Sequence, residues 1–113
     1  MRMARDYFSA PISRRIWDTK YRWRELGEVR DAGIEDSWRR VARALASVEP
    51  ADRAGWEQRF YSVLEDFKFL PGGRIQAGAG TGHKVTLFNC FVMGTIPDSL
   101  DAIFDALKEG ALT

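Results

Sequence analysis

The stretch that decides the fold is residues 69–113, which read FLPGGRIQAGAGTGHKVTLFNCFVMGTIPDSLDAIFDALKEGALT. It begins with a glycine-rich loop, continues through an apolar segment that carries Cys90, and then turns. A helix is expected from Asp98, Ser99 and Leu100 onward, because Asp98 or Ser99 can cap its first turn. A loop, a strand with one thiol, a turn and a helix in this order indicate part of an active site.

Residues 84–93 are predicted to form the β-strand that carries Cys90. Alternation gives it two largely apolar faces, one with Thr86, Phe88, Cys90 and Val92, the other with Val85, Leu87, Asn89, Phe91 and Met93. Strands that are apolar on both faces belong to sheets covered on both sides, which is the arrangement of α/β folds. The rest of the sequence hardly supplies the neighbours that such a strand needs for its backbone hydrogen bonds. The predicted fold class is therefore α/β, with one strand of a larger sheet.

Two helices are predicted upstream of this stretch, packed as a hairpin. The first spans residues 34–48 and stops before Pro50, and its apolar stripe is Trp38, Val41, Leu45 and Val48. The arginines expected on its other faces are Arg39, Arg40 and Arg43. Asp52 is expected to cap the second helix, whose apolar set is Trp56, Phe60, Val63, Leu64 and Phe67.

The glycine-rich loop divides the chain into two expected units. Pro71, Gly72 and Gly73 are expected to end the helical region, which makes residues 1–68 a helical N-terminal region and residues 69–113 a second unit. Glycines at this density indicate tight turns or a close approach of the backbone to something else. The loop lacks the Gly-Lys-Ser/Thr ending of a Walker phosphate loop, so a purely structural loop stays open as an interpretation.

Residues 13–23 mix aromatic with charged side chains. We expect a short helix from Ser13, with four buried residues: Ile16, Trp17, Tyr21 and Trp23. Aromatic side chains among arginines can stack on single-stranded nucleic acid, which would make binding steeply salt-dependent. Docking onto a neighbouring segment is favoured instead, because acidic residues such as Asp18 interrupt the positive charge.

Composition restricts the function classes. The 113 residues are enough for one small domain, and 45% of them are apolar. Residues 1–43 hold 11 Lys/Arg against 7 Asp/Glu (+4) and residues 44–113 hold 6 against 9 (−3), an asymmetry too mild for a nucleic-acid-binding patch. One cysteine excludes a disulfide within the chain and leaves no Cys/His cluster for zinc. With no signal-peptide pattern and no membrane-length apolar run, a cytoplasmic protein without metal, membrane or nucleic-acid contacts is predicted.

Four sequence segments occur together in the order that one known family shows. They are Phe69-Leu70-Pro71-Gly72-Gly73-Arg74, Ala77-Gly78-Ala79-Gly80-Thr81, Asn89-Cys90-Phe91-Val92, and Asp98-Ser99-Leu100 followed by Ile103. In this order the sequence resembles the start of the catalytic barrel of ribonucleotide reductase large subunits. The Pro-Gly-Gly-Arg form and the upstream run Trp17-Asp18-Thr19-Lys20-Tyr21 look most like the adenosylcobalamin-dependent class II enzymes. The resemblance is strong over residues 69–113, weaker over 10–25 and general between them.

The resemblance implies a fold, a reaction and partners. The fold would be a helical N-terminal region followed by the first strand and helix of a ten-stranded α/β barrel, with Cys90 on that strand. A thiyl radical on another cysteine, generated with adenosylcobalamin, would remove hydrogen from the ribose 3′ carbon. A thiol pair would then supply two electrons as the 2′ hydroxyl leaves as water. A thioredoxin-like protein would restore the thiols of a homodimer that acts on ribonucleoside di- or triphosphates.

The resemblance also implies residue roles. Cys90 would be one member of the redox pair and thus catalytic. The substrate-binding residues would be Gly72, Gly73, Asn89 and Cys90, and the residues that bind a deoxynucleotide effector would be Asp98, Ser99 and Leu100. Gly72 and Gly73 stand where many members carry Ser or Thr, so backbone N–H groups would replace a hydroxyl contact. The second redox cysteine and the cobalamin contacts would lie downstream of Thr113, so the chain alone is expected to be inactive.

Without the family resemblance, the residues are also compatible with a protein that is not an enzyme. A lone cysteine such as Cys90 is typical of a buried, inert core thiol, and no adjacent histidine would make it a hydrolytic nucleophile. The alternative is therefore a small helical adaptor, with Cys90 inert and the glycine-rich loop purely structural. In either interpretation, the last helix is expected to bury one stripe of apolar side chains: Leu100, Ile103, Phe104 and Leu107. Sequence beyond Thr113 would separate the two, and a class I relative with a separate radical subunit is also compatible.

Overall fold

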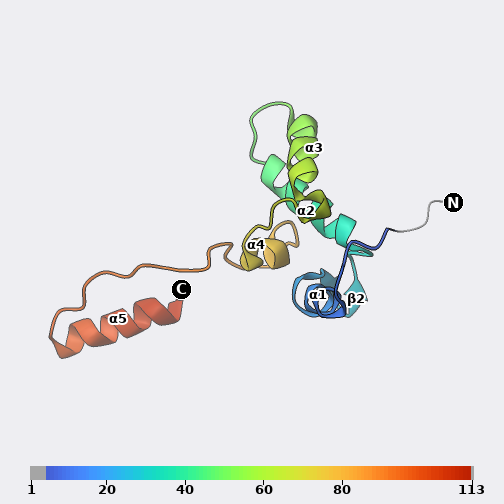
Figure 1. The fold of residues 1–113 in the computed structure, drawn as a ribbon. Helices are drawn as coiled ribbons and strands as arrows, with labels where there is room; N and C mark the ends of the chain where they lie inside the picture. The colour runs from blue at the N-terminus through green and yellow to red at the C-terminus, as the bar shows by residue number, and fades with distance from the viewer. Residues whose placement is uncertain (1–4, 113) are drawn as a thin grey trace.

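The structure is mostly helical, with one short two-stranded sheet (Figure 1). It is a computed structural model that describes residues 5–112. In chain order the elements are α1 (Pro11–Ile16), the π-helical turn η1 (Trp17–Tyr21), β1 (Arg24–Glu25), β2 (Glu28–Val29), α2 (Ile34–Ala46), α3 (Arg53–Leu64), the 3₁₀ turn η2 (Glu65–Phe67), α4 (Gly73–Gly78) and α5 (Leu100–Leu112). β1 and β2 are antiparallel neighbours. The predicted helical N-terminal region is therefore confirmed.

Helices α2 and α3 pack against each other, which confirms the predicted hairpin. At the start of α2 the Asp36 carboxylate accepts hydrogen bonds from the backbone N–H groups of Ala32 and Gly33, at 2.8 and 3.3 Å. At the start of α3 the Asp52 carboxylate accepts one from the Gly55 N–H at 3.2 Å, as predicted for a capping residue. Local side-chain caps therefore set where both helices begin.

The hydrophobic core surrounds the first half of α2. Its buried members are Trp17, Ile34, Trp38, Val41, Ala42, Leu64 and Ala79. The Trp38 ring meets the rings of Phe67 and Tyr7 edge-on, with centroids 5.3 and 4.9 Å apart. Such edge-on pairs add to the stabilisation that comes from burial alone. The core thus joins the two helices to the N-terminal segment and to residues after α4.

Three residues that were predicted to be buried between the two helices are exposed. Leu45 is 38% exposed, Val48 81% and Val63 49%. Helix α2 ends at Ala46, so Val48 lies beyond it, and Ala42 and Ala46 are buried instead. The buried face of α2 is rotated toward these two alanines, whose small side chains allow a close approach.

The N-terminal aromatic segment docks on α2, as favoured from the sequence. Helix α1 begins at Pro11, where the missing N–H costs nothing, rather than at Ser13. Trp17 is 7% exposed and its indole N–H donates to the Ser37 Oγ at 2.9 Å, so its ring is not free to stack on nucleic acid. Ile16 was expected to be buried but is 39% exposed, because neighbouring helical residues point in different directions and Trp17 faces the core.

A buried ion pair between Arg40 and Asp31 lies at the centre of the helical region. The Asp31 side chain is 3% exposed and the Arg40 side chain 5%, and their closest N···O distance is 3.0 Å. Asp31 Oδ2 also accepts hydrogen bonds from Ser37 Oγ at 2.6 Å and from the Trp23 N–H at 3.1 Å. Arg40 was expected on an outer face of its helix, and this is wrong. Burial is tolerated because the guanidinium has acceptors for its N–H groups.

Arg40 also explains why the chain stays helical after Pro71, where the sequence predicted the end of the helical region. Its guanidinium donates to the carbonyl oxygens of Gln76 at 2.9 Å and Ala79 at 2.7 Å, at the end of α4. Gly80 then turns the chain with φ +75°, and a Cβ there would lie 3.1 Å from the Arg40 carbonyl oxygen. A glycine is required at this position, both for the backbone conformation and for the close approach.

The predicted strand at residues 84–93 is wrong for this structure. Residues 83–97 form no helix or strand, although Val85 packs so closely on α4 that a Cβ on Gly78 would lie 2.7 Å from its Cγ2. A lone extended segment has nothing to pair its backbone N–H and C=O groups with, and no partner strand for it occurs within residues 5–112. The apolar sequence therefore stays unpaired.

Helix α5 begins where the sequence predicts but is not buried. The Ser99 Oγ accepts a hydrogen bond from the Ala102 N–H at 3.2 Å, which confirms the predicted cap. The stripe predicted to be buried is exposed: Leu100 73%, Ile103 48%, Phe104 61% and Leu107 67%. Figure 1 shows α5 lying away from the helical region, and the radius of gyration is 18.4 Å. A compact domain of this length would have about 13 Å.

We expect Arg40→Ala to destabilise the helical region by about 3–5 kcal/mol, because it leaves the Asp31 carboxylate buried without its cation. Urea unfolding followed by tryptophan fluorescence measures the change. Arg43→Ala is the matched control, since Arg43 is an exposed arginine of the same helix that pairs with Glu57. It is expected to cost less than about 1 kcal/mol. Equal losses in the two variants would contradict a central role for the buried pair.

Asp18 on η1 carries the clearest electrostatic shift of the helical region. Its Oδ1 accepts hydrogen bonds from Arg22 at 2.9 Å and from Arg24 at 2.6 Å. These two hydrogen bonds, from Arg22 first and then Arg24, hold the pKa of Asp18 below the usual 3.8. A carboxyl group with a lowered folded pKa stabilises the fold above its unfolded pKa, and this contribution is lost as the pH falls through the folded value.

We therefore expect the contribution of Asp18 to be complete above pH 3.8 and to disappear at lower pH. Arg24→Ala should raise the pKa of Asp18 back toward 3.8, as followed by the Cγ chemical shift in a pH titration. Arg30→Ala is the control, because Arg30 pairs with Glu25 and Glu28 rather than with Asp18. An unchanged Asp18 titration in Arg24→Ala would contradict this assignment.

Candidate functional site

The structure brings together two of the predicted substrate-binding residues. A Cβ built on Gly72 would lie 3.3 Å from the Asn89 Nδ2, so the Asn89 amide rests against the Gly72 backbone. Gly72 precedes α4 and Asn89 lies in the irregular segment that follows it. The contact forms even though residues 84–93 are not a strand. The Pro-Gly-Gly segment and the residue before Cys90, which the resemblance assigns to the same substrate, are thus neighbours in space.

Gly73 lies against a residue that the sequence did not assign to the site. A Cβ on Gly73 would lie 3.2 Å from the Tyr21 hydroxyl oxygen. The sequence predicted Tyr21 as a buried residue and as part of the run that resembles the class II enzymes, but nothing in its local pattern connects it with position 73. Absence of a side chain at Gly73 is what lets the phenol approach this backbone. Tyr21 therefore joins the candidate site.

Cys90 is exposed rather than buried. The interpretation of Cys90 as an inert core thiol is therefore wrong for this structure. The rings of Phe88 and Phe91 on either side of it approach each other, with centroids 6.4 Å apart. As the sequence holds a single cysteine, any two-electron thiol chemistry at Cys90 needs a second sulfur from another source.

Asp98, Ser99 and Leu100 lie at the start of α5. The Ser99 hydroxyl serves as the helix cap, and all three residues are exposed. Figure 1 shows α5 apart from α4, so these residues are not brought to Gly72 and Asn89. The candidate site of this structure therefore consists of Gly72, Gly73 and Asn89 with Tyr21 and the exposed Cys90.

The buried pair holds one wall of the candidate site in place. Arg40 binds two carbonyl groups of residues 76–79, and the Gln76 side-chain amide donates to the Pro71 carbonyl oxygen at 2.7 Å. These bonds tie the loop before α4 and the turn after it to helix α2. Arg40 is the second residue that the sequence missed, because an arginine beside Arg39 and near Arg43 carries no signal of burial.

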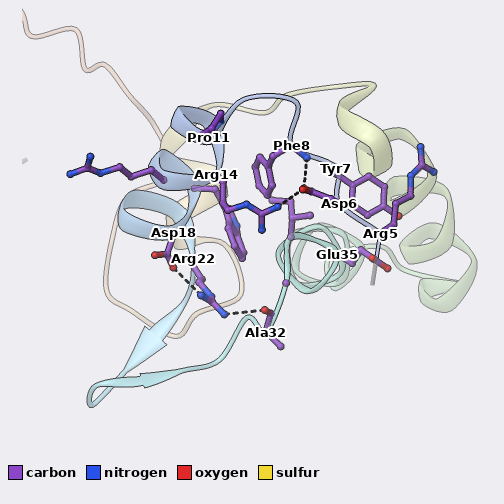
Figure 2. Close-up of a pocket in the computed structure, with 14 residues that line it drawn as sticks. Arg5, Asp6, Tyr7, Phe8, Pro11, Arg14, Asp18, Arg22, Ala32 and Glu35 are labelled. Atoms are coloured by element: carbon purple, nitrogen blue, oxygen red, sulfur yellow. Dashed lines mark hydrogen bonds and ion pairs between the residues drawn. The ribbon is translucent and has the colours of Figure 1, made fainter. Parts of the chain in front are cut away.

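A separate groove lies between the N-terminal segment, α1 and the start of α2 (Figure 2). Its volume is about 500 Å³. Its charged lining residues are Arg5, Arg14, Arg15, Arg22, Asp6, Asp18 and Glu35. Figure 2 shows Arg14 directed at Asp6 and Arg22 at Asp18, and both contacts are ion pairs. Three of its four arginines, Arg5, Arg14 and Arg22, are engaged in ion pairs, and three acidic residues line the same space, so the charge of the groove is largely balanced.

Burial raises the pKa of Tyr61, and the charge of Glu35, which lines this groove, adds to the effect. Within residues 5–112, no three His, Cys, Asp or Glu side chains lie close enough together to hold a metal ion. None of the helices in the described part of the chain is long and apolar enough to cross a membrane.

Comparison with known proteins identifies the helical region. The family described as "Ribonucleotide reductase, all-alpha domain" matches residues 7–84. The matched range holds α1 to α4 with the Arg40–Asp31 pair, and it ends before Asn89, Cys90 and α5. The family match therefore covers mainly the helices between residues 25 and 69, where the sequence alone showed only a general resemblance. Residues 85–113, which include part of the segment with the strong resemblance, lie outside the match.

Individual relatives agree with the family match. The chain is 36% identical over 78 residues to the vitamin B12-dependent ribonucleoside-diphosphate reductase of Mycobacterium tuberculosis, which covers 69% of this chain and 11% of the relative. It is 31% identical over 75 residues to the ribonucleoside-diphosphate reductase subunit alpha of Chlamydia trachomatis, covering 66% and 7%.

The chain therefore spans about a tenth of the length of the curated relatives that it matches. No solved structure matches it significantly. The family match nevertheless extends over more than half of the chain, across one continuous helical region with its own buried core. The chain belongs to the ribonucleotide reductase family, to which it is joined by the all-alpha domain.

Proposed function

We propose that the chain is the N-terminal part of a ribonucleotide reductase that converts ribonucleotides into 2′-deoxyribonucleotides, with Cys90 as one of two redox-active thiols. Each turnover breaks the 2′ C–O bond and forms a C–H bond in its place. Two thiols are oxidised to a disulfide, and their hydrogens end in the new C–H bond and in water. Cys90 would be one of the sulfurs, and thiol–disulfide exchange with a thioredoxin-like protein would reduce the disulfide again.

The contact between Gly72 and Asn89 is the single observation that carries the site assignment. It places the Pro-Gly-Gly backbone beside the residue that precedes Cys90. A ribonucleotide held there would meet the backbone N–H groups of Gly72 and Gly73 and the Asn89 amide, all of which can donate to its oxygen atoms. Neither glycine offers a side-chain hydroxyl, so the contacts at these positions come from the backbone.

Family membership supports the reductase over the helical adaptor considered above, and the exposure of Cys90 argues against an inert core thiol. The substrate proposed is a ribonucleoside diphosphate, because the relatives are named ribonucleoside-diphosphate reductases. We further propose that residues 69–113 begin a ten-stranded α/β barrel behind the helical region of residues 1–68. In that arrangement residues 84–93 would become a strand once neighbouring strands pair with them.

The proposal includes an effector site and a dimer contact at the start of α5. Asp98, Ser99 and Leu100 would bind a deoxynucleotide effector, and the exposed apolar face of α5 would be covered in a homodimer. A helix face with several exposed leucine, isoleucine and phenylalanine side chains is typical of a surface that is covered by another part of an assembly.

Adenosylcobalamin is proposed as the cofactor on the name of the mycobacterial relative alone. The described residues do not fit a cobalamin site. The one histidine, His83, lies 3.8 Å from Glu25 on the small sheet, and no cluster of metal-binding side chains occurs in residues 5–112. We therefore assign no cobalamin contact and no step of the reaction through cobalamin to these residues.

The experiment that tests the proposal is Cys90→Ser in the reductase polypeptide that carries this chain. We expect deoxyribonucleoside diphosphate formation over many turnovers to fall by about 100-fold or more, because one of the two electron-donating sulfurs is gone. Ribonucleotide binding, measured separately by equilibrium dialysis, should change little, since serine is similar in size and polarity. The expected loss is in kcat rather than in binding.

Thr95→Ser is the matched control, as it changes a nearby exposed residue of the same irregular segment. It should keep the turnover of the unmodified enzyme. The isolated 113-residue chain should form no deoxyribonucleotide with dithiol present, because the proposed reaction needs a radical cysteine besides the redox pair and this sequence holds one cysteine. Normal turnover by Cys90→Ser would refute the redox role of Cys90.

A further inference from the structure

A second pocket, distinct from the candidate site, is strongly basic. It lies between η1, β1, α4 and the start of the irregular segment, and its volume is about 360 Å³. Its ionisable lining residues are Lys20, Arg22, Arg24, Arg74 and His83, and no aspartate or glutamate lines it. We call it the basic pocket. It contrasts with the larger groove of Figure 2, where acidic side chains balance the arginines.

The positive charge of the basic pocket is only partly compensated by its surroundings. Arg22 and Arg24 share the single carboxylate of Asp18, and His83 lies 3.8 Å from the Glu25 carboxylate, both from outside the lining. Lys20 and Arg74 have no ion-pair or hydrogen-bond partner for their charged groups among the described residues. Several cations gathered around one concave space, with a shortage of carboxylates, lower the energy of an anion that enters it.

A buried hydrogen-bond donor in the lining also lacks a partner. The indole Nε1 of Trp23 is buried and makes no hydrogen bond in the described part of the chain. Trp23 lines the basic pocket between Arg22 and Arg24. A buried N–H without an acceptor costs free energy, so an acceptor oxygen that reached this nitrogen after a rotation of the ring would remove that cost. The charge of the lining is the observation that points to an anion, and the Trp23 indole serves as a reporter at the edge of the basic pocket.

We propose that the basic pocket binds a phosphate group, either of inorganic pyrophosphate or of a nucleotide. Phosphate oxygens accept bidentate hydrogen bonds from arginine and attract lysine as a point charge, and the pocket offers both kinds of side chain. The space of about 360 Å³ is larger than a single phosphate requires, so it accommodates a diphosphate. The proposal does not depend on the reductase function or on Cys90, since no lining residue belongs to the candidate site.

Titration of the 113-residue chain with pyrophosphate tests the proposal. At constant, low ionic strength, the Trp23 indole N–H resonance in ¹⁵N–¹H spectra should shift saturably, and more than the resonance of Trp17, whose indole N–H is bonded to Ser37. Lys20→Ala and Arg74→Ala should each weaken the apparent affinity about tenfold, which corresponds to the loss of one charge-assisted contact.

Arg15→Ala is the matched control, because it removes one exposed positive charge near Lys20 that does not line the basic pocket. Its affinity should stay within about twofold of the unmodified chain, since long-range attraction alone is weak. An equal loss in Arg15→Ala and Arg74→Ala, or no saturable shift of Trp23, would overturn the proposal. If Arg74→Ala fails to fold, titrations of the unmodified chain and of Lys20→Ala still test whether the basic pocket binds phosphate.

Titrations with ADP and adenosine distinguish a nucleotide from inorganic pyrophosphate as the ligand. Equal affinity for ADP and pyrophosphate would support recognition of phosphate alone, whereas tenfold tighter binding of ADP would support a nucleotide as the ligand. Adenosine, which has no phosphate, should cause no saturable shift of Trp23. Binding of adenosine as tight as that of ADP would refute a phosphate site.

Discussion

The Arg40–Asp31 ion pair is the interaction on which the rest of the helical region depends. Two buried charges are tolerated only when nearly every donor and acceptor is satisfied, and this condition decides where the surrounding chain can lie. Asp31 accepts from Ser37 and Trp23, while Arg40 donates to carbonyl groups near both ends of the region. Segments from η1 to the turn after α4 are thereby fixed relative to α2. A purely apolar contact, which has no directional requirement, would specify their positions less sharply.

This constraint connects packing with the candidate site. The loop that carries Gly72 and Gly73 leaves its apolar side chains Phe69 and Leu70 58% and 62% exposed, so hydrophobic burial does little to hold it. It is held instead by the Arg40 bonds to the carbonyls of Gln76 and Ala79 and by the Gln76 amide bond to Pro71. The backbone that is proposed to meet the substrate is therefore positioned by polar contacts from α2. A rigid wall of this kind lowers the entropy lost when a ligand binds.

Features set by local chemistry could be predicted from the sequence, and those set by distant partners could not. The caps at Asp52 and Ser99 depend on residues three positions away, and both predictions are confirmed. The burial of Arg40 depends on Asp31 and on two carbonyls nearly forty residues downstream, which no local periodicity encodes. The contact of Tyr21 with Gly73 is of the same kind. The family resemblance assigned Gly72 and Asn89 to one substrate site, whereas the pattern of apolar residues gave no sign of their contact.

The incorrect prediction of a strand at residues 84–93 has a different physical origin. The sequence does have the apolar pattern of a strand in a covered sheet, but a strand is stable only through bonds to another strand. Helix α5 behaves differently, because it forms from its own cap and backbone bonds even though Phe104 and Leu107 stay exposed. A helix satisfies its own backbone, so α5 exists without a partner, whereas a lone strand cannot. The apolar side chains of both segments are therefore evidence of a surface that this chain does not cover.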